Sequence, residues 1–224
     1  KGIIQELKVL LKTKSIGTNS DRALLLDFQA TLETKPEKAI KLEKDALAQI
    51  ENITADNARL VSNLHANLGG LYRMNGHPDL AREHMEKSIS LLDQFNLLHI
   101  NDSIPQIANY AMFLTEQQEP ERGISELQKL SGIIKEYHSD DCLDYAKVQE
   151  TLGTIYLMTA NLPQAKTHFK RAFKIYEKIW ADEPEMIEAK YQEIQELYPQ
   201  IGFCIGKKPV SYTHLRAHET EADL

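Results

Sequence analysis

The segment from His138 to Cys142 gathers the most metal-capable side chains in this 224-residue sequence, reading His-Ser-Asp-Asp-Cys. Imidazole, carboxylate and thiolate groups all bind transition metals such as zinc. Serine and aspartate directly before a helix, however, accept hydrogen bonds from its unpaired N–H groups and complement its dipole. Because apolar residues at helical spacing follow, we interpret the segment as a helix start capped by Asp140 and predict no metal site.

Candidates for other chemistry are few. His65, His77 and His84 lack ligand spacing on one helix face with a carboxylate partner, so we expect packing or surface roles for them. The sequence has no Gly-rich phosphate loop, no Gly-x-Ser-x-Gly, no Cys-x-x-Cys and no His-Glu-x-x-His. We therefore predict that the chain is not an enzyme and uses no cofactor.

Charge and hydropathy exclude further classes of partner. The net charge of −7 argues against a surface that follows nucleic-acid phosphates. No apolar run approaches the roughly 18–20 residues that a membrane span needs. The two cysteines, Cys142 and Cys204, are too few for a disulfide framework and suit a reducing compartment. We expect a cytoplasmic protein that contacts neither nucleic acid nor a membrane.

The elements that must position any site repeat every 42 residues. Leu68-Gly69-x-x-Tyr72 recurs 84 positions later as Leu152-Gly153-x-x-Tyr156. The unit between them carries Tyr110-Ala111-x-x-Leu114 in the same register, and prolines stand at 36, 78, 120 and 163. Such a period is typical of stacked supersecondary units.

Small residues mark one position of each unit. Ala39, Ala81, Gly123 and Ala165 share a register early in the second half of each unit. A small side chain lets two helices approach to the ~8–10 Å of close packing. The pattern therefore predicts an all-α solenoid of antiparallel helix pairs.

We expect helices over 20–34 and 36–51, 55–75 and 78–94, 103–117 and 120–137, and 141–160 and 162–180. Thr54 and Ser103 are the expected N-caps of two of them, as Asp140 is of a third. The units lie near 20–53, 54–95, 103–138 and 141–180, with partial helices at 1–13 and 185–198. The solenoid thus covers 1–200, and 201–209 is a linker.

The two ends of the sequence need separate treatment. Residues 210–224 read VSYTHLRAHETEADL and resemble an in-frame translation of a DNA-sequencing adaptor, so we leave this tail out of the fold. The first residues have helical spacing and no initiator Met, so we expect the chain to be part of a longer protein.

The repeat resembles the tetratricopeptide repeat. The best match comprises Leu152, Gly153, Tyr156, Ala165, Phe169 and Ala172. The commonest version has a 34-residue period and a proline that closes the second helix; here Asp93, Lys135 and Glu177 stand at that place. The longer period is similar to the kinesin-light-chain subtype.

This resemblance implies a concave surface, lined by the first helix of each pair, that binds a peptide or protein. The matching positions are Asn63, Asn67, Arg73, Met74, Asn109, Met112, Glu116, Lys147 and Glu150. Asn67 and Asn109 are equivalent in successive units, and each carboxamide offers a donor and an acceptor to a peptide backbone. The alternative is that both are caps or inter-helix hydrogen-bond partners. Methionines would supply adaptable apolar contact.

We therefore favour a peptide-binding scaffold within a larger cytoplasmic regulatory or signalling protein. One alternative is the peptide-pheromone receptor domain of a bacterial transcriptional regulator. Another is a structural module that self-associates through exposed solenoid ends.

Overall fold

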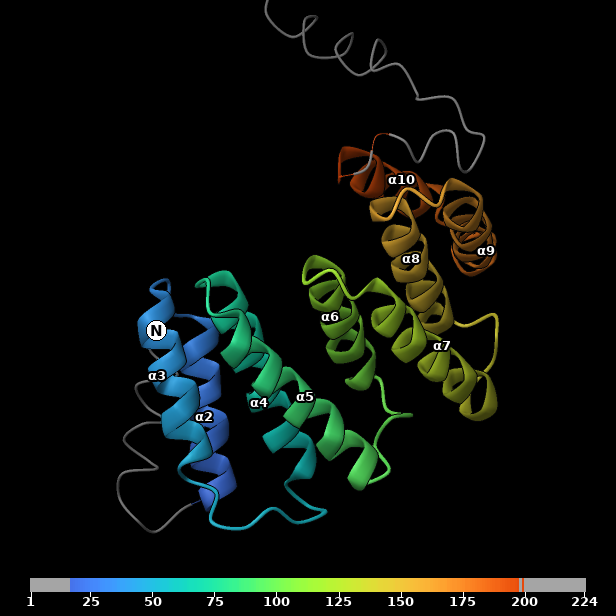
Figure 1. The fold of residues 1–224 in the computed structure, drawn as a ribbon. Coiled ribbons are helices and arrows are strands. Elements are labelled where there is room, and N and C mark those ends of the chain that lie inside the picture. Colours follow the sequence, from blue (N-terminus) through green and yellow to red (C-terminus); the bar gives the residue numbers. More distant parts are fainter. Residues whose placement is uncertain (1–16, 198, 200–224) are drawn as a thin grey trace, which may run out of the picture. The chain divides into compact units, whose positions relative to one another are not determined.

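The computed structural model describes residues 17–197 and 199, and all regular elements in that part are helices (Figure 1). They are α2 (Asn19–Thr31), α3 (Pro36–Leu47), α4 (Ala58–Met74), α5 (Pro78–Gln94), α6 (Ser103–Glu116), α7 (Pro120–Tyr137), α8 (Leu143–Met158), α9 (Leu162–Ile179) and α10 (Pro184–Leu197). The predicted all-α helical repeat is confirmed. The helix expected at 1–13, the linker at 201–209 and the adaptor-like tail lie outside the described residues.

The chain divides into two compact units, residues 1–140 and 141–224. In the first unit α2 pairs with α3, α4 with α5 and α6 with α7, and each pair contacts the next through α3–α4 and α5–α6. The first helices of these pairs, α2, α4 and α6, also contact one another in sequence. In the second unit α8 pairs with α9, which contacts α10.

The pairs α4–α5, α6–α7 and α8–α9 each have a crossing where one helix carries a glycine. A Cβ on Gly69 of α4 would lie 2.6 Å from Cγ of Met85 on α5. A Cβ on Gly123 of α7 would lie 2.6 Å from the backbone oxygen of Ala111 on α6. Gly153 of α8 faces the ring of Phe169 on α9 in the same way. Of the small residues predicted to allow close packing, Gly123 lies at such an approach, and the glycines of the two Leu-Gly-x-x-Tyr motifs do so as well.

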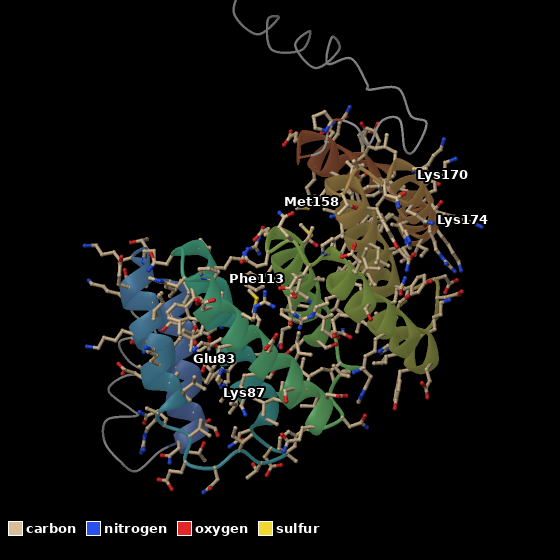
Figure 2. All side chains as sticks on the ribbon, viewed as in Figure 1. Glu83, Lys87, Phe113, Met158, Lys170 and Lys174 are labelled. Atoms are coloured by element: carbon tan, nitrogen blue, oxygen red, sulfur yellow. The ribbon has the colours of Figure 1, made fainter. Side chains whose placement is uncertain are left out.

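The second and third pairs share one apolar cluster. Tyr72 and Met85 are buried with Tyr110 and Phe113 of α6. Phe113 is labelled in Figure 2, as are Glu83 and Lys87, which lie exposed on α5. Burial of large side chains of this kind contributes about 1.5–3 kcal/mol each.

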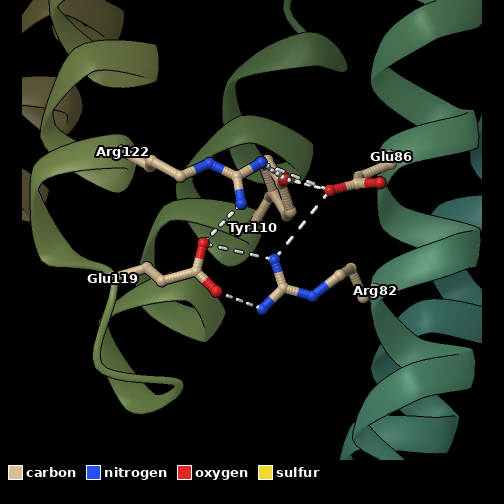
Figure 3. A network of polar contacts seen from close by, with 5 residues as sticks. All are labelled: Arg82, Glu86, Tyr110, Glu119 and Arg122. Atoms are coloured by element: carbon tan, nitrogen blue, oxygen red, sulfur yellow. Dashed lines mark hydrogen bonds and ion pairs between the residues drawn. The ribbon is translucent and has the colours of Figure 1, made fainter.

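A polar network joins the same two pairs and meets this cluster at Tyr110 (Figure 3). Arg82 of α5 donates to Glu119 at 2.6 Å, and the Tyr110 hydroxyl donates to Glu86 at 2.8 Å. Arg122 of α7 bonds to Glu119 and lies 3.4 Å from Glu86. Hydrogen bonds from Arg82 and Arg122 lower the pKa of Glu119. Charges of opposite sign thus alternate across the contact between the second and third helix pairs.

The turns inside the pairs also follow the period. Gly76, Gln118 and Ala160, spaced by 42, all have positive φ, at 75°, 65° and 58°. The next residue in each turn donates its N–H five residues back, as His77 does to Tyr72 at 2.9 Å. The left-handed residue lets these N–H groups bond to carbonyls at the helix end. Of the three, only Gly76 lacks a Cβ and so adopts this conformation without steric strain.

The three predicted N-caps are wrong. Asn57 precedes α4, while the Thr54 carbonyl accepts hydrogen bonds from Asn57 and Ala58 in the preceding turn. Ser103 is already helical, and its hydroxyl donates to the Leu98 carbonyl at 2.6 Å. Cys142 caps α8, its sulfur accepting from the Tyr145 N–H at 3.4 Å. Of these three helices only α8 has a side-chain cap, because Asn57 and Asp102 make no capping hydrogen bond at the starts of α4 and α6.

Several helices are shorter than predicted. α2 ends at Thr31 rather than at 34, because the Glu33 carboxylate accepts the N–H groups of Thr34 and Lys35 and forms a turn. α3 ends at Leu47 rather than at 51, where the N–H groups of Gln49 and Ile50 bond three residues back. These ends depend on local hydrogen bonds that the apolar period does not encode.

The crossing at Gly123 can be tested within α7. Gly123→Ala should lower the free energy of unfolding by about 1–2 kcal/mol, because its Cβ meets backbone that cannot rotate away. A Cβ on Gly132 of the same helix would have no neighbour within 4 Å. Gly132→Ala should therefore raise the free energy of unfolding by about 0.5–1 kcal/mol. Urea unfolding followed by circular dichroism measures both; equal stabilisation by the two substitutions would contradict the close approach.

Candidate functional site

The first helices of the second and third pairs bring several predicted groove residues together. Arg73 and Met74 of α4 and Asn109 of α6 line one open hollow of about 200 Å³. Ala66 and Gly70 form part of its wall. Small residues thus leave space between α4 and α6, and longer polar and apolar side chains surround it.

Two of the predicted ligand-binding residues bind each other. The Arg73 guanidinium donates from Nε to Glu116 at 2.8 Å and makes a second bond to the same carboxylate. Both side chains are about a third exposed, so the pair forms part of the surface between α4 and α6. Bidentate geometry makes it a fixed border of the hollow.

A buried polar cluster underlies the hollow. Ser62 donates to Gln106 at 2.8 Å, and Ser88 bonds to the same oxygen. Gln106 in turn donates to Asn63 at 2.6 Å. Asn63 also donates to Asp102 at 3.3 Å, so this predicted groove residue links α4 to the start of α6.

The two equivalent asparagines have different surroundings. Asn67 is half-buried and turned toward the preceding pair, where Nδ2 donates to Asp27 at 2.8 Å and to Glu43 at 3.3 Å. Asn109 is exposed at the hollow. Of the two, Asn109 is the one whose carboxamide faces solvent at the candidate site.

The remaining predicted residues lie apart from this hollow. Met112 of α6 is half-buried. In the second unit, Lys147 is exposed and pairs with Asp144 at 3.7 Å. Glu150 accepts from the Tyr176 hydroxyl at 2.6 Å and from Lys190 at 3.0 Å, which joins α8, α9 and α10. A peptide-binding role for these residues stays a prediction.

An apolar stripe on the first helices was predicted only in part, through Met74 and Met112. It consists of Leu24, Phe28, Leu32, Met74 and Met112, and Phe28 and Met74 are 60% and 82% exposed. Leu24 and Phe28 precede Ala66 and Gly70 of the hollow by 42, and Leu32 precedes Met74 likewise. Extending the groove register one unit back would have found Leu24 and Phe28 of α2 and Leu32 at its C-cap.

The histidines form stacks between helices. The His65 and His84 Nδ1 atoms are 2.9 Å apart, and His84 stacks on Tyr72 at 5.4 Å between centroids. Burial, then the His84 charge, lowers the pKa of His65 to about 4; burial also lowers the pKa of His84. A packing or surface role was predicted for both, and these contacts are those of packing.

The described residues contain no group of three or more His, Cys, Asp or Glu side chains that could hold a metal ion. Across that same part of the chain, no helix combines the length and apolarity needed to cross a bilayer. The candidate site is therefore a surface of helices.

Comparison with known proteins agrees with this geometry. Residues 103–178 match the family model of the tetratricopeptide repeat. Among solved structures, BtubC (BKLC) from P. vanneervenii is similar with a TM-score of 0.63 at 20% identity, over 78% of this chain and 70% of that one. No curated protein sequence matches the chain.

A putative kinesin light chain of Podospora anserina with nearly identical TPR-like repeats is similar too. One crystal structure of it has a TM-score of 0.62 at 15% identity, over 80% of this chain and 89% of that one. Residues 103–178 are therefore of the tetratricopeptide type, and the described helices share the fold of kinesin-light-chain repeats. That fold generally mediates protein–protein interaction, and its members are generally non-enzymatic scaffolds.

The histidine stack predicts sensitivity to acid. A folded-state pKa of about 4 for His65 means that the unfolded chain binds more protons, so stability falls as pH drops from about 6.5 to about 4. Gln149 occupies the equivalent position beside His168, so His65→Gln should keep the contact to His84. We discount the effect because His65 is partly exposed. Between pH 6.5 and 4 the free energy of unfolding of the variant should fall by about 1–2 kcal/mol less than that of the parent. Urea titrations at pH 4.5 and 7 measure it; identical losses would contradict the prediction.

Proposed function

We propose that the tetratricopeptide repeats of this chain hold a peptide segment of another protein against the apolar stripe of α2, α4 and α6. The exposure of that stripe is the observation that carries the proposal. Leu24 and Phe28 of α2 and Leu32 at its C-cap are all at least half exposed, and Met74 extends the stripe to α4. Exposed apolar side chains gathered on one face mark interaction sites.

Spacing on α2 suits a helical or extended ligand. Leu24, Phe28 and Leu32 follow at intervals of four, so they form one ridge along the helix. An apolar ligand face laid on it would bury several large side chains, each contributing about 1.5–3 kcal/mol before the entropy cost of association. The expected affinity is therefore micromolar, suited to reversible binding.

Polar groups beside the stripe can orient the ligand. Asn109 offers a donor and an acceptor at the hollow, which suits a peptide backbone. The Arg73–Glu116 pair satisfies its own charges and so adds little net charge there. Binding of this kind fits a scaffold within a cytoplasmic regulatory or signalling protein.

The test uses amphipathic peptides of about 15 residues with leucines at intervals of four, and scrambled versions of each. The parent protein should bind the patterned peptides in fluorescence anisotropy. Phe28→Ser and Met74→Ser should each weaken binding about tenfold or more, since an anchor contact is lost. Neither should alter the circular dichroism spectrum, because both side chains are exposed.

Leu80→Ser is the matched control. Leu80 is also an exposed apolar residue, but it lies on α5, the second helix of its pair, and so outside the stripe. It should bind like the parent. Equal binding by all variants, or equal binding of scrambled peptides, would contradict the proposal. Light scattering across concentration completes the test: a concentration-dependent mass that Phe28→Ser abolishes would assign the stripe to self-association instead.

A further inference from the structure

The first helix pair carries two acids where the other pairs are apolar. Asp27 of α2 and Glu43 of α3 stand at the crossing, in register with three other residue pairs. These are Gly69 with Met85, Ala111 with Leu127, and Gly153 with Phe169. Because the same crossing brings Gly69 and Gly153 against their partners, the two carboxyl groups face each other inside the pair.

Glu43 is buried without full hydrogen bonding. Its side chain is on the same buried face of α3 as Ala39 and Ala46, and the residue is 1% exposed. Asn67 donates to Oε1 of Glu43 and to Asp27, but Oε2 of Glu43 has no hydrogen-bond donor among the described residues. A buried, unpaired carboxylate oxygen is costly.

Two carboxyl groups in contact require a positive charge between them. Burial, then the charge of Asp27 and a hydrogen bond with it, raises the pKa of Glu43 to about 8. At neutral pH a proton therefore fills this role, while the neutral carboxamide of Asn67 donates to the same carboxyl group from α4. Lys44, next along α3, instead lies over the Tyr72 ring at 5.9 Å.

The acid pair adjoins the apolar stripe. Asp27 is half-buried, three residues after Leu24 and one before Phe28, so it lies at the edge of the exposed ridge of α2. A cationic side chain that reached Asp27 would bring its aliphatic stem across Leu24 and Phe28, as lysine and arginine stems do on apolar surfaces.

We propose that the Asp27–Glu43 pair receives a lysine or arginine side chain of the bound segment, which therefore carries a basic residue beside its apolar anchors. This inference rests on the proposed function of the same surface. On binding, the ligand cation replaces the proton held by Glu43, which passes to solvent. Charge complementarity favours a basic partner, because no ion pair among the described residues involves Asp27 or Glu43.

The test variant is Asp27→Ala/Glu43→Leu, which installs the residues of the third pair, Ala111 and Leu127. Apolar residues fill the same crossing in the third pair, and Glu43→Leu also removes the unpaired buried oxygen of Glu43, so this variant should fold. The probes are the leucine-patterned peptides with Lys, Arg, Gln or Glu beside the central leucine. The parent should bind the Lys and Arg peptides about tenfold tighter than the Gln peptide, and the variant should bind all three alike.

The control Glu37→Gln/Asp45→Asn removes two exposed carboxylates from α3, so it changes the net charge at pH 7 by one unit more than the loss of the proton-bearing acid pair does. It should keep the preference for Lys and Arg. Binding without any charge preference in the parent, or a preference that persists in Asp27→Ala/Glu43→Leu, would overturn this inference and leave the proposed function standing. Absence of binding to every patterned peptide would overturn both.

A second readout follows the proton. Calorimetric titration of the parent with the Lys peptide at pH 7, in buffers of different ionisation enthalpy, should show release of up to one proton. The Gln peptide, and the variant with either peptide, should show none. Equal heats in all buffers for the parent and the Lys peptide would contradict the exchange.

Discussion

The close crossing of two helices within each pair is the constraint on which the rest of the structure depends. Wherever one helix offers Gly69, Gly123 or Gly153, its partner approaches to contact distance. Large side chains of successive pairs, such as Tyr72 and Phe113, then share one buried cluster. The first helices are then free to expose a common face, since their packing needs are met on the other sides.

The architecture could be predicted because it depends on a period. Apolar and small residues recur every 42 positions, and helix pairs are the structure that such recurrence stabilises. Helix ends and caps could not be predicted, because they depend on single hydrogen bonds such as that of Cys142 to Tyr145. Several groups near each end can satisfy the same N–H, and only three-dimensional geometry chooses among them.

The candidate site was predictable in part for the same reason. Register assigns a residue to a face, which is why Arg73, Met74 and Asn109 all line the hollow. Register does not assign partners, so the pairing of Arg73 with Glu116 emerged only from the structure. Asp27 and Glu43 were visible in the sequence, because the equivalent positions of the other repeats hold small or apolar residues. A polar residue at a repeat position that is otherwise apolar indicates a candidate functional site.

The same stack of a histidine on a tyrosine occurs twice, 84 positions apart. His84 lies on Tyr72 beside His65, and 84 positions later His168 lies on Tyr156 beside Gln149. The intervening pair has Leu114 and Glu126 at the matching places and so lacks the motif. An array in which alternate hairpins resemble each other more than their neighbours do is what duplication of a two-hairpin block would leave behind. The heritable module of this protein would then be about 84 residues long.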